Sequence, residues 1–401
     1  MTSRKAISGT NLEQAKSHNR RVVIEAIRTN GALSRASIAR LTALSSQTIS
    51  NIVEELERTE LLRPEAILKG ARGQPAVPYS INPDGGYSIG LQLDHQLAVG
   101  VVTDLSGTMR ARIERSVDRP TPAQAMPLLA AIAAELIATS RLDRTRLLGI
   151  GMSMPGPFGV EGLTSVGPTA LPGWHDFPVA EELQRLTGIP VMVENDATAA
   201  AIGERLYGVA KNLDSFVYLF IGTGLGAGLF LNGHLYKGSR HNAGEIGHII
   251  VRPGGLACGC GKRGCLERYV SLRAAYETLD LPDPDHASPE LLEELLAKGD
   301  SRLDAWISDA VEPLRQAIDV LELALDPETV VLGGFMPLPV LEELASRLEP
   351  LHLSVASTSA RTTPRVLVGA AGKDTSVLGA AALPIFSETN PQFDVLQKPF
   401  G

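Results

Sequence analysis

Cysteines, aromatic residues and long apolar runs are all scarce in this chain of 401 residues. Only three cysteines are present, all between residues 258 and 265, and Phe, Trp and Tyr together make up 4%. Three cysteines in one short segment argue against a disulfide framework and favour a reducing cytoplasm with a bound metal. The absence of about 18 consecutive apolar residues argues against a membrane span, and the N-terminal segment lacks the apolar stretch of a signal peptide. We therefore expect a cytoplasmic protein without a membrane partner.

Charged residues are common but unevenly distributed. The chain is 44% hydrophobic and 20% charged, typical of a globular protein with two or three domains. Residues 1–80 contain 12 Lys and Arg against 7 Asp and Glu, a net charge of +5, whereas the rest of the chain carries −13. A basic N-terminal region on an acidic body indicates that this region alone meets a polyanion.

The most specific chemical pattern lies between Gly244 and Ser271. A histidine precedes a C-x-C-x4-C pattern in a glycine-rich loop, which supplies the one imidazole and three thiolates that a structural zinc ion prefers. The predicted ligands of this Zn²⁺ are His248, Cys258, Cys260 and Cys265. Glu245 and Glu267 flank them, so that a metal would also fix where these carboxylates point. The alternative is three buried cysteines and a core histidine without a metal.

Apolar spacing in the N-terminal region predicts three short helices. One covers residues 20–28 and ends at Gly31, and the next two begin at the potential N-caps Ser34 and Ser45. This spacing matches a helix-turn-helix, in which the start of the third helix enters the major groove of DNA. The predicted base-contacting residues are Ser46, Gln47, Thr48, Ser50 and Asn51. The predicted phosphate contacts are Arg20, Arg21, Arg35 and Arg40. A small helical module that docks a protein is the alternative.

Residues 61–68 predict a small β-wing, with strands at Leu61–Arg63 and Ala66–Leu68. The Gly- and Pro-rich residues 69–86 predict an irregular linker. Within it, Arg72 either enters a minor groove or belongs to a plain linker. We expect a DNA-binding domain at residues 1–65, a wing and linker at 66–86, and an effector and oligomerisation domain at 87–401.

The body predicts an α/β fold in two lobes, because strands and helices alternate and glycines follow the strands. The expected strands are Tyr87–Leu93, Ala98–Thr103, Leu147–Met152, Pro190–Val193, Phe216–Ile221, Leu229–Leu231 and Thr329–Leu332. The loop Gly222–Gly228 and the pair Gly333-Gly334 either cradle a nucleotide or are only tight turns. Asp196, at a strand end, is suited to act as a general base or to accept a hydroxyl. The tail from Ser387 is expected to be irregular.

Five motifs resemble those of a known family. They are LPGW (Leu171–Trp174), ENDATAAA (Glu194–Ala201), GTGLGAG (Gly222–Gly228), GEIGH (Gly244–His248) and CGCGKRGCLE (Cys258–Glu267). Nearly the whole chain is similar to the ROK family (repressors, open reading frames and sugar kinases), including the helix-turn-helix of its repressor branch. The resemblance implies an N-terminal winged helix-turn-helix followed by a two-lobed actin-like, hexokinase-like ATPase fold. It also implies a homodimer or tetramer and the zinc site described above. The sugar site that it implies consists of Asn195, Asp196, Glu245, His248 and Glu267, with Asp196 in the position of the kinase base.

Departures from the family pattern bear on activity. Kinases of the family carry D-x-G-x-T in the first lobe, whereas the aligned residues Gln92–Gln96 here read QLDHQ. The magnesium-binding carboxylate is lost, and Asp94 adds a negative charge where phosphate would lie. Ala170 stands where sugar-binding members often have asparagine, and Gln74 replaces an arginine of the linker. We therefore expect no kinase activity and no catalytic residue.

The expected function is a sugar-responsive transcriptional repressor of carbohydrate uptake or catabolism genes. Its partners would be operator DNA and a small sugar or sugar derivative, and ligand binding would change the spacing of two DNA-binding domains. The alternative is an ATP-dependent hexose kinase with an accessory DNA-binding domain. A third possibility is control by a phosphotransferase-system protein that docks on the body.

Overall fold

The structure, a computed structural model, describes residues 12–66, 77–156, 171, 173–174, 177–240, 242–281, 287–356, 361–370 and 372–390. The chain forms two compact units. The N-terminal unit comprises the described parts of Met1–Gly86, Asp104–Ser106 and Ile385–Gly401, and the body comprises those of Tyr87–Thr103 and Gly107–Pro384.

Three helices build the N-terminal unit: α1 (Leu12–Asn30), α2 (Arg35–Thr42) and α3 (Ser46–Arg58). The predicted caps are confirmed, because Ser34 Oγ accepts the Ser37 N–H and Ser45 Oγ accepts the Thr48 N–H, each at 3.2 Å. Gly31 follows α1 with φ of +76°, which ends the helix as expected. Apolar side chains of the three helices form one core, which includes Val23, Ile24, Ile27, Ile38, Ile49, Ile52, Val53 and Leu56.

A small antiparallel sheet completes this unit. Its strands are β1 (Leu33–Ser34), β3 (Pro78–Ile81) and β2 (Leu62–Pro64), in that order. The first wing strand is confirmed, but its partner is β3, within the segment expected to be an irregular linker. Tyr79 explains the difference, since its ring is buried in the helical core and Leu33 pairs with it. Of the expected second wing strand, Ala66 belongs to no strand, and the rest lies outside the described residues.

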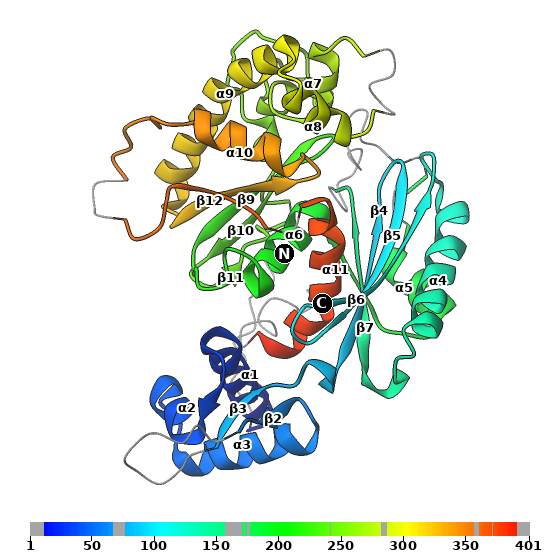
Figure 1. The fold of residues 1–401 in the computed structure, drawn as a ribbon, viewed down its shortest axis with the longest axis vertical. Helices are drawn as coiled ribbons and strands as arrows, with labels where there is room; N and C mark the ends of the chain where they lie inside the picture. The colour runs from blue at the N-terminus through cyan, green and yellow to red at the C-terminus, as the bar shows by residue number, and fades with distance from the viewer. Residues whose placement is uncertain are drawn as a thin grey trace, which may run out of the picture. The chain divides into compact units, whose positions relative to one another are not determined.

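The first lobe of the body is a five-stranded mixed sheet in the order β6-β5-β4-β7-β8. Its strands are β4 (Tyr87–Leu93), β5 (Leu97–Asp104), β6 (Met109–Ser116), β7 (Leu147–Met154) and β8 (Val191–Asn195). Helices α4 (Pro122–Thr139) and α5 (Val179–Thr187) lie on one face of this sheet, as Figure 1 shows. By length and composition α4 could cross a membrane, but Met126, Leu129 and Ile132 pack into the core of the lobe.

The second lobe repeats this arrangement, with strand order β11-β10-β9-β12-β13. Its strands are β9 (Phe216–Ile221), β10 (Leu225–Leu231), β11 (His234–Leu235), β12 (Thr329–Gly334) and β13 (Val366–Val368). Its helices are α7 (Leu272–Thr278), α8 (Glu290–Ala297), α9 (Ser301–Leu325) and α10 (Leu338–Arg347). In each sheet the first strand is central, the next two follow on one side and the last two on the other. The body is therefore a topological duplication, and the α/β prediction is confirmed.

Two helices lie at the junction of the lobes: α6 (Asp196–Tyr207) and α11 (Thr375–Thr389). They pack closely, since a Cβ at Gly379 would lie 2.0 Å from the carbonyl oxygen of Ala199. The expectation of an irregular tail from Ser387 was wrong for its first three residues, because α11 continues through Thr389, and residues 391–401 lie outside the described residues. The glycine loop is also shorter than expected: β10 begins at Leu225, so that only Gly222–Gly224 form a turn. Likewise Gly333 and Gly334 end β12 in register with Phe220 and Ile221.

Candidate functional site: a carboxylate-lined cavity beside a cysteine–histidine cluster

A cavity of about 420 Å³ lies in the body where elements of both lobes meet. Its wall includes the β4–β5 turn, the start of α6, the β9–β10 turn and the loop after β11. All five residues of the predicted sugar site line it: Asn195, Asp196, Glu245, His248 and Glu267. The structure thus brings together residues spread over more than 70 positions of the sequence.

The junction of β8 and α6 positions Asn195 and Asp196. Asn195 Oδ1 caps α6 by accepting the Thr198 N–H at 2.7 Å, and Asp196 Oδ1 accepts the Ala197 N–H at 2.8 Å. Burial, together with the negative charges of Asp94 and Glu245, raises the pKa of Asp196 to about 7, although the Ala197 N–H opposes the shift. The side chain borders the open cavity and is only half-buried by accessible surface, so this effect is weaker than in a closed core. Asp196 is a strong acceptor that a bound hydroxyl would stabilise.

Glu245 and Glu267 supply two further carboxylates. Burial raises the pKa of both, and each is stabilised in its charged form by a neighbour, His248 for Glu245 and the Leu225 N–H for Glu267. The hydrogen bond from the Leu225 N–H to Glu267 Oε2 measures 3.2 Å and ties the carboxylate to the start of β10. The loop carrying Glu245 lies directly on β10, because a Cβ at Gly244 would stand 2.0 Å from the Ala227 carbonyl oxygen. The cavity therefore presents fixed acceptors suited to hydroxyl groups.

The predicted zinc ligands form one cluster. One ligand atom from each of His248, Cys258, Cys260 and Cys265 lies within 4.8 Å of all the others. Cys260 Sγ and Cys265 Sγ are 3.6 Å apart, as are Cys258 Sγ and His248 Nδ1. Zn–S bonds of about 2.3 Å in a tetrahedron place two sulfurs about 3.8 Å apart, so these separations fit a tetrahedral divalent ion. The cluster can bind a metal.

The electrostatics of the thiols agree with this donor set. Burial raises the pKa of Cys258, and burial with the neighbouring thiols raises the pKa of Cys265 to about 12. Three thiolates at such close range repel one another, which favours the protonated thiols. A divalent cation that binds them favours the thiolates instead.

His248 connects the cluster to the cavity. Its Nδ1 faces Cys258, while its Nε2 lies 3.9 Å from Glu245 Oε2. Burial lowers the pKa of the imidazole, although Glu245 opposes this shift. An imidazole with one nitrogen toward each side is the arrangement that a ligand shared by a metal and a polar cavity requires.

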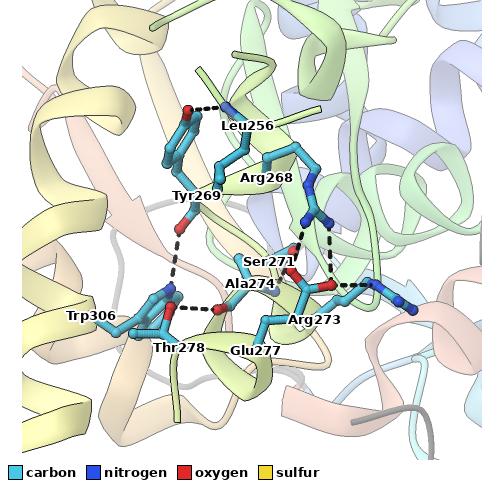
Figure 2. A network of polar contacts seen from close by, with 9 residues as sticks. All are labelled: Leu256, Arg268, Tyr269, Ser271, Arg273, Ala274, Glu277, Thr278 and Trp306. Carbon is cyan, nitrogen blue, oxygen red and sulfur yellow. Dashed lines mark hydrogen bonds and ion pairs between the residues drawn. The ribbon is translucent and has the colours of Figure 1, made fainter. Parts of the chain in front are cut away.

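A polar network supports the cysteine loop from behind (Figure 2). The Tyr269 hydroxyl accepts the Leu256 N–H at 3.0 Å, and the Tyr269 carbonyl accepts the Trp306 indole N–H at 3.1 Å. Arg268 and Arg273 both donate to the Glu277 carboxylate, at 2.6 Å and 2.8 Å. The network anchors the segment that follows Cys265 and Glu267 to α7 and α9.

The β4–β5 turn contributes two residues that were not among the predicted sugar-site residues. Asp94 and His95 both line it, and they are joined by a hydrogen bond of 2.6 Å between Asp94 Oδ1 and His95 Nδ1. Gln92, by contrast, is only 4% exposed and does not line the cavity. A further lining residue is Asn242, whose buried Oδ1 has no hydrogen-bond partner among the described residues. The polar turn directly after a buried strand was the available signal for Asp94 and His95.

The LPGW motif supports the fold of the first lobe. Trp174 is buried there and donates its indole N–H to the Pro120 carbonyl at 2.8 Å. Ala170, singled out in the sequence, lies outside the described residues.

The predicted DNA-contacting residues of α3 lie at or near the surface of the N-terminal unit. Ser46, Gln47 and Asn51 are exposed, and Thr48 and Ser50 are half-buried. Gln47 Nε2 donates to Asn51 Oδ1 at 2.9 Å, so the two amides form one polar patch. Arg72 lies outside the described residues. Arg35 stacks on Tyr79 with its guanidinium 5.4 Å from the ring centroid, which adds a structural role to the predicted phosphate contact.

The duplicated α/β body and its cavity define a sugar-kinase-like protein, similar to the ROK hexokinase of Thermus thermophilus (TM-score 0.58, 30% identity, covering 74% of this chain and 97% of that one). The ROK family model matches residues 89–385, and the chain belongs to the ROK family.

Two further relatives are regulators. The crystal structure of a ROK family transcriptional regulator, a homologue of the E. coli MLC protein, has a TM-score of 0.75 and 25% identity over 96% of this chain and 98% of that one. The xylose repressor of Bacillus subtilis (strain 168) is 31% identical over 264 residues, covering 66% of this chain and 68% of the repressor.

Proposed function

We propose that the protein is a cytoplasmic, sugar-responsive transcriptional repressor whose body holds the effector and whose N-terminal unit binds operator DNA. The observation that carries this proposal is the share of the chain that matches each of two solved structures. Similarity to the transcriptional regulator extends over 96% of this chain, whereas the hexokinase, matched over nearly its full length, leaves about a quarter of the chain unmatched. A repressor needs a DNA-binding unit, which the N-terminal unit would supply, whereas a sugar kinase does not need one.

The N-terminal unit has the elements of a winged helix-turn-helix: α2 and α3 joined by a tight turn, and a small sheet beside them. In this assignment α3 enters the major groove, where the amides of Gln47 and Asn51 suit adenine and Ser46, Thr48 and Ser50 contact neighbouring groups. Arg72 remains the proposed minor-groove contact. Two such units in a homodimer or tetramer would meet a near-palindromic operator.

The cavity would hold a sugar through its carboxylates and the Asn195 amide. Asp196 occupies the position of the kinase base but serves as a hydroxyl acceptor, since Asp94 and His95 stand in the turn where a phosphate-binding loop is needed. Coupling requires that the sugar bind one arrangement of the protein better than another.

The cysteine–histidine cluster would hold a structural Zn²⁺ through His248, Cys258, Cys260 and Cys265. A closed set of four protein ligands leaves no position for a reacting water, so the zinc would be structural. It would make rigid the loop that carries Glu245 and Glu267.

Kinase activity is the second candidate, favoured by the similarity to the hexokinase and by Asp196. A phosphotransferase-system protein docking on the body is a further mode of control. One experiment separates these proposals: an operator fragment is selected from genomic DNA, and its binding is followed by fluorescence anisotropy with a panel of sugars, with and without Mg-ATP. We expect specific binding that one sugar weakens independently of ATP. ATP-dependent phosphorylation of a sugar would establish the kinase instead, and specific binding that no sugar alters would refute the sensor.

A further inference from the structure

Asp94 and His95 lie on a turn held from three directions. The Asp94 N–H donates to the Leu97 carbonyl at 2.8 Å and closes the turn between β4 and β5. The N–H groups of Val117 and Arg119 donate to the carbonyls of Gln96 and His95 at 2.8 Å and 2.7 Å. The turn is therefore a fixed part of the cavity wall, because β4, β5 and the segment after β6 all hold it.

The Asp94 carboxylate has a defined orientation. Its Oδ1 accepts two hydrogen bonds from His95, one from the backbone N–H at 2.7 Å and one from Nδ1 at 2.6 Å. A carboxylate held by two donors on one oxygen keeps its rotamer and remains an acceptor toward the cavity that it lines. His95 is buried, 8% exposed, which restricts this pair further.

Negative charge dominates the groups that face this cavity. Four carboxylates line it: Asp94, Asp196, Glu245 and Glu267. The basic groups of its wall are fewer: His95 is bonded to Asp94, His248 belongs to the cysteine cluster, and Lys262, whose Nζ donates to the His248 carbonyl at 3.3 Å, is the one lysine among the described residues that lines it. Asp94 also contributes to the raised pKa of Asp196, so its charge is felt at the sugar-binding residue. An anionic group in this cavity would meet four carboxylates against one lysine, so the net interaction would be repulsive.

We propose that Asp94 is a specificity-determining residue of the effector site, that His95 positions it, and that the pair restricts the effector to sugars without a phosphate or carboxylate group. The proposal rests on the sensor function above and adds the chemical class of its ligand. A hydroxyl donates to Asp94 where a sugar phosphate would be repelled.

Matched ligand pairs test this directly. The full-length protein is titrated calorimetrically at pH 8 with xylose, glucose and N-acetylglucosamine, with the 6-phosphates of the two hexoses, and with glucuronate. The variants are Asp94→Asn, His95→Ala and, as a control, Asp214→Asn, which changes an exposed aspartate that does not line the cavity. The wild type should bind a neutral sugar at least about 100-fold more tightly than its anionic counterpart, since like charges at close range in a half-enclosed site repel strongly.

The two variants should separate charge from position. Asp94→Asn should reduce this preference at least about tenfold, mainly through gained affinity for the anionic sugar, because the charge is removed and the shape kept. His95→Ala should weaken neutral-sugar binding about five- to tenfold but keep the preference, because the charge remains while its support is lost. Asp214→Asn should match the wild type.

Several outcomes would overturn the proposal. Equal binding of neutral and phosphorylated sugars by the wild type would do so, as would an Asp94→Asn variant whose affinities for both classes change by the same factor. Either result leaves the sensor function intact. If none of the sugars binds the wild type, both the specificity proposal and the sensor function are wrong.

Discussion

The hydroxyl of Tyr269 accepts a hydrogen bond from the backbone N–H of Leu256 at 3.0 Å. The cysteine loop runs between these two residues, so this bond, together with the backbone bond from the Gly264 N–H to the Leu256 carbonyl at 2.8 Å, closes a segment that contains Cys258, Cys260 and Cys265. The approach leaves no space for a side chain at the neighbouring position, since a Cβ at Gly255 would stand 2.2 Å from the same hydroxyl. A tyrosine outside the metal-binding cluster therefore helps to close the loop that carries it.

Tyr269→Phe removes this closure without changing the ring. Leu256 N–H is left partly buried without its acceptor, which should lower the free energy of unfolding by about 1 kcal/mol and accelerate zinc release to a chelator. Chemical denaturation and a colorimetric zinc assay measure the two effects. Tyr236→Phe, at an exposed tyrosine, is the control and should change neither. Identical zinc release by both variants would show that Tyr269 does not hold the loop.

Cys260→Ser tests the ligand set. A neutral hydroxyl is a much poorer ligand than a thiolate, so metal per chain should fall well below one equivalent. Because Cys260 also lines the cavity, sugar affinity should fall with the metal content. Elemental analysis and calorimetry measure the two quantities. An unchanged metal content would contradict the assignment of the four ligands.

Asp196 should give the ligand-free protein a distinctive pH dependence. Its pKa is about 7 in the folded chain and about 3.9 when unfolded, so the folded state binds the extra proton between these values. Stability from this group is therefore full below about pH 4 and is lost as pH rises toward 7. Asp196→Asn has no carboxyl group to titrate and therefore lacks this loss. The free energy of unfolding of the variant, relative to that of wild type, should rise by roughly 2–4 kcal/mol from pH 4.5 to 8.

Thermal unfolding of both proteins across this pH range isolates the contribution of Asp196, because the other titrating groups are common to both. The same variant should show a blunted sugar response while operator binding persists, since the carboxylate lines the cavity in the body. A constant stability difference at all pH values would mean that Asp196 titrates normally.

Gln47→Ala tests direct readout by α3. Loss of an amide that contacts a base should weaken operator binding by about 1–3 kcal/mol but leave binding to random DNA nearly unchanged. Gln184→Ala, at an exposed glutamine on α5 of the body, is the matched control. Fluorescence anisotropy with both kinds of DNA supplies the measurement. Equal losses on operator and random DNA would make Gln47 a positioning residue only.

Local patterns in the sequence were sufficient for the cluster and for the helix starts. Three of the four predicted ligands lie within eight residues, so short-range backbone turns bring them together whatever the rest of the fold does. Ser34 and Ser45 cap their helices by bonds to residues three positions on, which a sequence displays directly. The ENDATAAA motif likewise predicted that Asn195 and Asp196 lie at the end of a strand.

Long-range pairing decided what the sequence could not show. Pro78–Ile81 forms a strand because it pairs with Leu33 of β1 on one side and with Leu62 of β2 on the other, both of them distant in the sequence. The sequence contained Asp94 and His95 only as departures from a phosphate loop. Asp94, His95 and Asp196 line one cavity because β4, β5 and β8 belong to the same sheet, while Glu245 and Glu267 come from the second lobe, so the charge that this cavity presents is a sum over both lobes. Local spacing determined which groups are available, and tertiary contacts determined which of them meet.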